Sequence, residues 1–274
     1  IEKIIKKNVL PKLEKPGTKL LLKVPIVNET ILAKVREKMI SSFGGNFYEV
    51  IVGGAAFNQE VENLLHQLKF PYTVGYGATE CAPIICYEDW KKFVPGSCGK
   101  AAYGMEVRID SKDPANIAGE ILVKGPNVML GYYKNEEATA ETIDADGWYH
   151  TGDLGVMDSE GNVFIKGRSK NMLLGPSGQN IYPEEIEDQL NSFPYVAESL
   201  VVDRHGKLVA LIHPDYDTAF KEGKTVQDVA AQMELNRGEL NKNLPAYCQI
   251  TGVQIYSEEF EKTPKKSIKR YLYQ

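Results

Sequence analysis

Hydrophobic and polar positions alternate with two different periods along the chain. In residues 28–43, apolar residues recur at the spacing of one helix face, which predicts a helix. Residues 48–52 form a short apolar run that predicts a buried strand, and a second helix is predicted over 58–70 with Asn58 as its N-cap. The stretch YTVGYG follows as the next strand. Because strand, helix and strand in this order form an α/β layer, we expect ligands at the carboxyl ends of its strands.

The pattern changes twice further along the chain. From about 95 to 168, short apolar runs between Gly, Asp and Pro turns predict a small barrel or a distorted sheet. After about 170 the pattern predicts an α+β domain, with strands at 171–174, 198–203, 207–212 and 250–257, helices at 182–193 and 225–243, and a turn at 204–206. We place the boundary near Arg168 to Lys170, which gives domains over 1–168 and 169–274.

Composition and charge are those of an ordinary soluble globular protein. The 274 residues suggest about two domains, and 43% of them are hydrophobic. A net charge of −5 argues against binding of the whole molecule to nucleic acid or acidic membranes. No apolar stretch reaches the roughly 20 residues of an integral membrane span, although peripheral membrane contact stays open. The chain begins with Ile1 rather than Met, so we expect a piece of a longer protein.

Cysteine usage limits the cellular compartment. The four cysteines contain no CxxC pair, so neither a zinc site nor a disulfide scaffold is expected. There is no signal-peptide pattern either. We therefore expect free thiols in a reducing compartment, the cytoplasm.

The stretch YGATE, residues 76–80, carries the first candidate chemistry. It places an aromatic ring, bare glycine backbone, a hydroxyl and a carboxylate side by side, which are the groups that a nucleotide and its magnesium ion need. A tight turn at a strand end, with Glu80 as a capping acid, explains the same residues without a ligand. In GWYHTGDLG, Asp153 could accept hydrogen bonds from ribose hydroxyls or close a hairpin turn. His150 is expected to be a packed histidine.

Two later stretches add cations. Arg168 ends a predicted strand, where its planar guanidinium can face a diol or a phosphate. Pro183 suits the first position of a helix, and the acids at 184, 185 and 187 suit its positive N-terminal end, so we assign them no catalytic role. The tail EKTPKKSIKR has five basic residues, which fit a solvated tail, a nucleic-acid patch or a lysine that moves onto a phosphate.

Taken in order, these stretches resemble the AMP-forming adenylate-forming superfamily, which includes acyl-CoA synthetases, luciferases and peptide-synthetase adenylation domains. The matching stretches are GGAAF, YGATE, GEILVKGPNVMLGYY, GWYHTGDLG, GRSKNMLLGPSGQNIYPEEIE and the terminal lysines. Within the superfamily the chain most resembles bacterial long-chain fatty acid–CoA ligases. The resemblance implies the C-terminal portion of a large AMP-binding domain, an α/β layer plus a small β-barrel, followed by a small α+β lid domain.

The resemblance also implies roles for individual residues. Those implied to bind the nucleotide are Gly53, Gly54, Ala55, Tyr76, Gly77, Thr79, Asp153 and Arg168, with Tyr76 stacked on adenine, Thr79 catalytic at the α-phosphate, and Asp153 and Arg168 on the ribose. Glu80 would hold Mg²⁺, and Gly178 would line the CoA channel. Lys170 falls at the hinge between the domains, where relatives often carry aspartate. Lys269 is favoured as the catalytic lysine, while Lys265 and Lys266 stay open because the tail reads SIKR where many relatives read Gly-Lys.

In such ligases a carboxylate attacks the α-phosphate of ATP and releases pyrophosphate; the lid domain then rotates, and the CoA thiol displaces AMP. The resemblance thus implies ATP or AMP, Mg²⁺ and coenzyme A, with a medium- to long-chain fatty acid as substrate. Small Gly77 and Ala78 would leave room for the acyl group. Aryl and amino acids stay open.

The glycine-bearing stretches before Tyr76 do not resemble the Ser/Thr/Gly-rich loop that relatives use for the β- and γ-phosphates. We therefore expect the parent protein to be a ligase and this piece to be inactive by itself. An AMP-binding or regulatory fragment without turnover is the alternative. Nucleic-acid binding is less favoured, because only Tyr271 and Tyr273 could stack on bases beside the basic tail.

Overall fold

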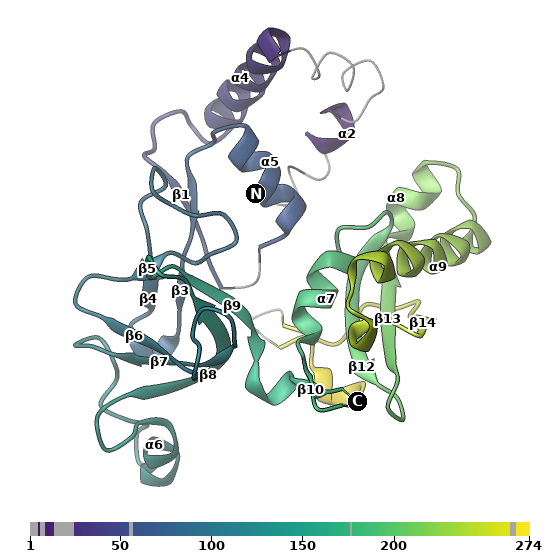
Figure 1. The fold of residues 1–274 in the computed structure, drawn as a ribbon. Helices are drawn as coiled ribbons and strands as arrows, with labels where there is room; N and C mark the ends of the chain where they lie inside the picture. Colours follow the sequence, from purple (N-terminus) through teal and green to yellow (C-terminus); the bar gives the residue numbers. More distant parts are fainter. Residues whose placement is uncertain (1–4, 6–8, 14–24, 55–56, 176, 264–266) are drawn as a thin grey trace. The chain divides into compact units, whose positions relative to one another are not determined.

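The chain divides into two compact units in the computed structural model, which describes residues 5, 9–13, 25–54, 57–175, 177–263 and 267–274 (Figure 1). The first unit comprises Ile1–Thr151 and Gly155–Ile165, and the second comprises Gly152–Leu154 and Lys166–Gln274. The division falls close to the boundary expected from sequence. That Lys170 acts as a hinge stays a prediction.

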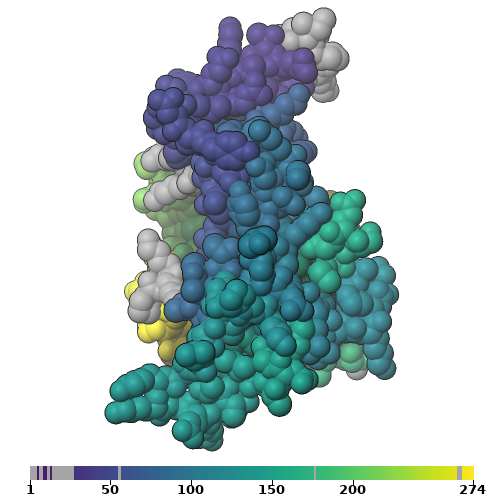
Figure 2. Space-filling model, turned by 90° about the vertical axis from the view of Figure 1, so that its left-hand side faces the viewer, coloured from purple at the N-terminus to yellow at the C-terminus, as the bar shows by residue number. Residues whose placement is uncertain are grey.

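The first unit opens with an α/β layer. Its elements are α2 (Leu10–Leu13), α4 (Pro25–Ser42), β1 (Val50–Val52), α5 (Gln59–Gln67) and β2 (Tyr72–Val74), and β1 pairs with β2 in parallel. The predicted helices and the N-cap are confirmed, because the Asn58 side chain accepts a hydrogen bond from Val61 N at 3.1 Å. Side chains of α4 and α5 share one apolar core around Leu65 and Phe70. In Figure 2 the purple region of the chain, which includes α4, lies directly on the blue region that comes next in the sequence.

The prediction that β1 is a buried strand is wrong. Ile51, its central residue, is 54% exposed. The sheet in this part of the described chain has two strands, so β1 lies at its edge. An apolar run predicts a strand but does not say how many of its faces are covered.

The rest of the first unit contains the short strands predicted between 95 and 168. The elements are β3 (Tyr76–Gly77), η1 (Thr79–Cys81), β4 (Ile84–Tyr87), β5 (Lys100–Ala101), β6 (Glu106–Asp110), β7 (Gly119–Lys124), α6 (Glu136–Thr142), β8 (Tyr149–Met157) and β9 (Val163–Arg168). They form a three-stranded sheet in the order β3-β4-β5 and a four-stranded sheet in the order β6-β7-β8-β9. An apolar cluster that includes Ile85, Ile121 and Tyr149 joins the strands.

The second unit has the α+β composition expected from the sequence. Its elements are η2 (Ser169–Asn171), β10 (Leu173–Leu174), β11 (Asn180–Ile181), α7 (Pro183–Leu190), β12 (Val196–Asp203), β13 (Leu208–Pro214), α8 (Tyr216–Lys221), α9 (Val226–Asn243), η3 (Ala246–Cys248), β14 (Gly252–Ile255) and η4 (Arg270–Leu272). Strand β13 lies between β12, which is antiparallel to it, and β14, which is parallel. Side chains of α7 and α9 pack with this sheet around Leu190, Ile212 and Met233.

Local signals set several boundaries in the second unit. The turn predicted at 204–206 is present, and His205 and Gly206 adopt positive φ angles of 58° and 78° between β12 and β13. Helix α9 begins at a capping box, in which Thr225 and Asp228 satisfy each other's backbone N–H groups. None of the described helices has the length and apolar character needed to cross a bilayer. The four cysteines are free and buried.

Candidate active site

The loop after β1 brings bare backbone close to the end of β2. A Cβ atom on Gly53 would lie 3.3 Å from the carbonyl oxygen of Gly75, and Gly54 has a φ of +90°, which L-residues with side chains rarely adopt. These glycines are the predicted adenine face. Ala55, the third member of that set, lies outside the described residues. The loop therefore offers peptide surface at the carboxyl end of a strand, where ligands of α/β layers bind.

Tyr76 and Gly77 form β3 directly after this layer. The Tyr76 ring packs in the apolar cluster with Ile85 and is 8% exposed, so little of its face is open to a base. Stacking on adenine stays a prediction. At Gly77, a Cβ atom would lie 2.0 Å from the carbonyl oxygen of Pro83. The close approach of the chain at Pro83 therefore explains this glycine, rather than the room for an acyl group that the sequence suggested.

Thr79 and Glu80 occupy the single turn η1 that follows β3. Thr79 is exposed, whereas Glu80 is half-buried and held at two points. Its carboxylate oxygen Oε1 accepts a hydrogen bond from the Tyr132 hydroxyl at 3.0 Å, and its carbonyl oxygen accepts one from Met129 N at 2.7 Å. Burial, and then the Glu80 carboxylate, raise the pKa of Tyr132, so this hydroxyl is a donor at neutral pH. The turn thus places the fixed Glu80 carboxylate beside the exposed Thr79 side chain.

The carboxylate of Glu80 fits magnesium only together with other ligands. Among the described residues, no three His, Cys, Asp or Glu side chains come together as a metal cluster. Magnesium in nucleotide sites usually keeps several waters and takes one or two carboxylates plus phosphate oxygens. Tyr132 holds Oε1 and leaves Oε2 without a hydrogen-bond partner among the residues that the structure describes. One available carboxylate oxygen suits a magnesium site completed by phosphate oxygens and water. It does not suit a site in which protein side chains supply every ligand.

Asp153 and Arg168, the predicted ribose contacts, lie together in the second unit. Arg168 Nε is 2.8 Å from Asp153 Oδ1; the Asp153 side chain is 11% exposed and that of Arg168 is 60% exposed. Gly152, just before the acid, has a φ of +69°, and the Arg168 guanidinium lies near the place of its missing side chain. The guanidinium therefore fixes a nearly buried carboxylate while most of the Arg168 side chain stays exposed, an arrangement suited to a diol.

The predicted hinge and channel residues are both exposed. Lys170 is the middle residue of η2, and Gly178 lies in the tight turn between β10 and β11. Gly178 has a φ of +81° and its N–H donates to the carbonyl oxygen of Gly175 at 2.9 Å. The structure describes one conformation of this segment, so rotation at Lys170 and contact of Gly178 with CoA stay predictions.

Lys269, the favoured catalytic lysine, sits in the C-terminal segment next to Glu261. Its Nζ atom is 3.1 Å from Glu261 Oε2, and the hydrogen bond and charge of that carboxylate raise the pKa of Lys269. The side chain is 31% exposed. It is therefore a protonated cation on the surface of the second unit. Lys265 and Lys266, the two alternatives, lie outside the described residues.

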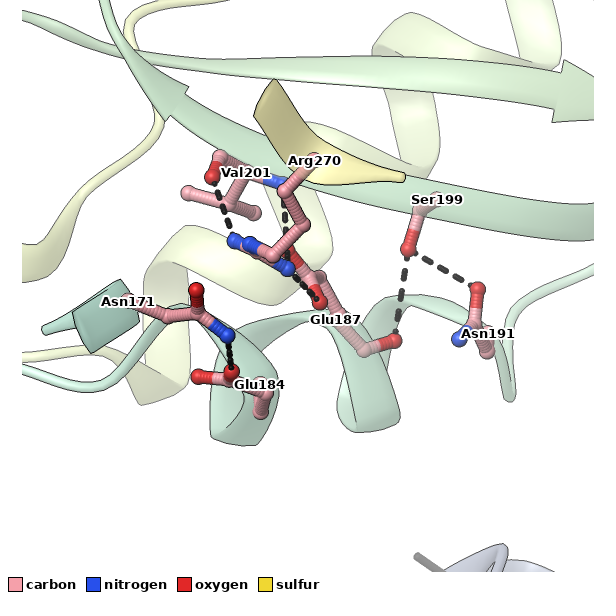
Figure 3. A network of polar contacts seen from close by, with 7 residues as sticks. All are labelled: Asn171, Glu184, Glu187, Asn191, Ser199, Val201 and Arg270. Atoms are coloured by element: carbon pink, nitrogen blue, oxygen red, sulfur yellow. Dashed lines mark hydrogen bonds and ion pairs between the residues drawn. The ribbon is translucent and has the colours of Figure 1, made fainter. Parts of the chain in front are cut away.

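The acids of α7 do more than face the positive end of the helix. Glu184 Oε1 accepts a hydrogen bond from Asn171 Nδ2 at 2.6 Å, and Glu185 Oε1 is 2.8 Å from Lys166 Nζ. Glu187 lies one turn further on, is buried, and pairs with Arg270 (Figure 3). The helix-end explanation is thus wrong for Glu187, because a partner 83 residues away accounts for it.

His150 has the structural environment expected of it. Its Nδ1 atom is 3.0 Å from Glu120 Oε2, and its Nε2 atom is 3.7 Å from Asp144 Oδ2. Both ring nitrogens therefore face carboxylates of neighbouring segments. The histidine links three parts of the first unit, and no catalytic role is needed to explain it.

Part of the chain is similar to known proteins. Residues 7–133 match the family of AMP-binding enzymes. A 2-succinylbenzoate–CoA ligase of Bacillus cytotoxicus is 37% identical over 185 residues, which cover 64% of this chain and 38% of that protein. A 2-succinylbenzoate–CoA ligase of Bacillus cereus is 35% identical over 195 residues, 66% of this chain and 40% of that protein. The chain spans about two fifths of the length of these relatives.

Solved structures of AMP-binding enzymes have the same fold. O-succinylbenzoate coenzyme A synthetase from Bacillus subtilis, in complex with ATP and magnesium ion, is similar with a TM-score of 0.68 and 25% identity, over 86% of this chain and 49% of that one. An anthranilate CoA ligase in complex with anthranoyl-AMP has a TM-score of 0.70 at 23% identity, over 81% of this chain and 42% of that one. The predicted fold class, part of an adenylate-forming enzyme, is confirmed.

These comparisons support the AMP-binding enzyme superfamily and give no support to long-chain fatty acid specificity. The relatives named above are 2-succinylbenzoate–CoA ligases. A third relative, a CoA ligase for a methyl-dioxo-octahydroindenyl propanoate from Rhodococcus jostii, is 45% identical over 145 residues, 52% of this chain and 27% of that protein. The motifs that suggested a fatty acid ligase therefore do not identify the acid.

Sequence reasoning missed two residues of the candidate site. Tyr132 holds Glu80, and its only sequence signal is its place in GEILVKGPNVMLGYY, one of the motifs that carried the resemblance. Arg270 holds Glu187, and it looked like one more base in a basic tail. Both partners are distant in sequence, so no local pattern points to either pair.

Proposed function

We propose that this chain is part of an ATP-dependent acid–CoA ligase, which joins a carboxylic acid to AMP and then transfers the acyl group to coenzyme A. The observation that carries the proposal is the pairing of a nearly buried Asp153 with an exposed Arg168 in a chain that matches AMP-binding enzymes over residues 7–133. A carboxylate beside a planar multi-donor cation fits the two hydroxyls of a ribose.

The residues take separate roles in this proposal. The Thr79 hydroxyl donates to the α-phosphate, and the Glu80 carboxylate holds Mg²⁺ through the oxygen that Tyr132 leaves free. When bound, the metal supplies positive charge against the phosphates. The Lys269 ammonium stabilises the negative charge that develops at phosphorus as the acid attacks and pyrophosphate leaves. Rotation at Lys170 then exchanges Lys269 for the Gly178 turn, and the CoA thiol displaces AMP.

For the acid, we propose a ring-bearing carboxylic acid. Support comes from the relatives, whose names specify 2-succinylbenzoate and a bicyclic propanoate, and from the structural neighbours named for o-succinylbenzoate and anthranilate. A medium- or long-chain fatty acid is the competing substrate, and an amino acid is a third. An assay with these acids decides among them.

A binding protein without turnover is the second candidate. It is favoured by the stretches before Tyr76, which contain nothing similar to the phosphate loop of such ligases. The two candidates differ in one measurement: AMP release with ATP, Mg²⁺ and CoA across a panel of benzoates, bicyclic propanoates, fatty acids and amino acids. It is made on this chain and on the natural full-length protein.

A ligase gives acid-dependent AMP and acyl-CoA from the full-length protein, with the ring-bearing acids turned over fastest. Nucleotide binding with no acid-dependent AMP from either protein supports the second candidate. Faster turnover of palmitate than of every ring-bearing acid would refute the proposed substrate class but not the reaction.

A further inference from the structure

Arg270, the residue after Lys269, is held by three side-chain hydrogen bonds. Arg270 Nη1 lies 2.8 Å from both carboxylate oxygens of Glu187, and Arg270 Nη2 donates to the carbonyl oxygen of Val201 at 3.0 Å. The same carboxylate accepts a hydrogen bond from Val201 N at 2.6 Å (Figure 3). The two side chains are only 13% and 11% exposed. A buried, multiply bonded ion pair of this kind specifies one geometry.

The residue before Lys269 is also anchored. Ile268 packs on an apolar cluster that contains Leu200, Leu211 and Phe260. Between these two anchors, the backbone N–H of Lys269 donates to the carbonyl oxygen of Glu261 at 2.8 Å. The backbone of the lysine is therefore fixed on both sides, while its ammonium stays at the surface.

The same helix that holds Arg270 also holds the segment around Lys170. At the first turn of α7, Glu185 Oε1 lies 2.8 Å from Lys166 Nζ, and Glu184 Oε1 accepts a hydrogen bond from Asn171 Nδ2 at 2.6 Å. A Cβ atom on Gly167 would lie 2.7 Å from Glu184 Oε2, so the backbone of this segment also passes close to the helix. One helix of eight residues thus connects both flanks of the predicted hinge to the terminal segment.

We propose that Glu187 and Arg270 are positioning residues that fix the terminal segment on α7, so that Lys269 moves as one body with this helix. The inference rests on the proposed function for the role of Lys269. A lysine on a loose tail would spend little time at the phosphate, and small errors of placement are costly in catalysis. The pair therefore acts on the adenylation half-reaction, in which the ammonium works, and not on the thioester half-reaction.

The test compares conservative variants in the natural full-length protein. Arg270→Lys keeps the charge but cannot bond both Glu187 oxygens and Val201 O together. Glu187→Gln keeps the shape and removes the charge. Lys242→Gln is the matched control, because it breaks an exposed ion pair with Glu239 on α9. Each variant is first shown to be folded by its melting curve.

Three readouts then separate anchoring from catalysis. Hydrogen exchange of the peptide 261–273 is expected to quicken roughly tenfold in Arg270→Lys and Glu187→Gln, because a local opening becomes easier. Acyl-AMP formation, followed as pyrophosphate release, is expected to fall about tenfold in both, since the ammonium is misplaced. Thioester formation from supplied acyl-AMP is expected to stay within about twofold of the parent, because Lys269 has no part in it. Lys242→Gln is expected to leave the hydrogen exchange and both half-reactions unchanged.

Three outcomes would overturn the inference. Unchanged exchange in 261–273 would show that the pair does not anchor the segment. Equal losses in both half-reactions would show a merely structural role. Faster exchange with normal acyl-AMP formation would show that Lys269 needs no positioning. If the unmodified protein forms no acyl-AMP at all, the proposed function fails, and the exchange experiment still decides whether the anchor exists.

Discussion

Arg168 Nε lies 2.8 Å from Asp153 Oδ1, so an exposed cation is tied to a nearly buried acid. Surface-accessible pairs add little to stability, because solvent screens them. In the proposed function the pair has a further role, which is to bind the ribose.

Arg168→Leu and Asp153→Asn should accordingly weaken AMP binding by about tenfold or more, the loss of one to two charge-assisted hydrogen bonds. Arg168→Leu should change the free energy of unfolding by less than about 1 kcal/mol. Isothermal titration with AMP and chemical denaturation measure the two quantities, with Lys242→Gln as the surface control. Unaltered AMP affinity in both variants would exclude a ribose site here.

Removing the Tyr132 hydroxyl should loosen the Glu80 carboxylate. Tyr132→Phe deletes one hydrogen bond to Glu80, worth about 1 kcal/mol, and should raise the Mg²⁺ concentration needed for half-maximal ATP binding about fivefold. The adjacent Tyr133→Phe is the control, because Tyr133 is 88% exposed. Identical Mg²⁺ dependence in the two variants would argue that Glu80 is not a metal ligand.

Gly77 should not tolerate a side chain. In Gly77→Ala the new Cβ would lie 2.0 Å from the carbonyl oxygen of Pro83, so the backbone must shift, at a cost of about 2–3 kcal/mol in the free energy of unfolding. Gly238→Ala, inside α9 with open space around it, should instead stabilise by roughly 0.5–1 kcal/mol. Urea denaturation of both variants checks the contrast. A neutral Gly77→Ala would show that this close approach is not rigid.

The stability that the N-terminal cap of α9 contributes should decrease at acidic pH. The backbone hydrogen bond from Thr225 is the largest cause that lowers the pKa of Asp228 below its ordinary value of 3.8. The unfolded chain therefore binds this proton at a higher pH than the folded chain does, and the stabilising contribution is present above 3.8 and lost as the pH falls through the lower folded value.

Asp228→Asn should thus destabilise the chain at pH 7, and the difference in melting temperature from the parent should shrink as the pH approaches 3. Asp217→Asn in α8 is the control, because Asp217 is a comparable exposed acid that takes no part in a capping box. Should the Asp228→Asn difference stay constant with pH, its carboxylate would not be the group responsible.

Local features of the fold could be predicted, and pairings across long separations could not. Asn58 was readable as a helix start because the cap and the backbone N–H that it accepts from lie within one turn. Asp153 and Arg168 were each suspected from a motif, and the structure shows that they meet. Arg270 and Glu187 are 83 residues apart, and Tyr132 and Glu80 are 52 apart. Hydrophobic period carries no information about which distant polar groups will pair.

The acid substrate could not be predicted from the sequence, for a different reason. In the proposed function, the motifs from Tyr76 to Arg168 supply groups for a nucleotide, and every acid used by such ligases would meet the same phosphate chemistry. The residues that select an acid line a pocket, and a pocket is assembled from positions that share no spacing. The fatty acid expectation therefore rested on resemblance alone, and the named relatives do not support it.

The measurement that tests the account most directly is AMP release from ATP by the natural full-length protein, with and without a ring-bearing acid, and with Lys269→Ala beside it. The account predicts AMP release that requires the acid and Mg²⁺, continues to acyl-CoA when CoA is added, and falls by about a hundredfold or more in the variant. AMP release that is absent, or that proceeds equally without any acid, would contradict it.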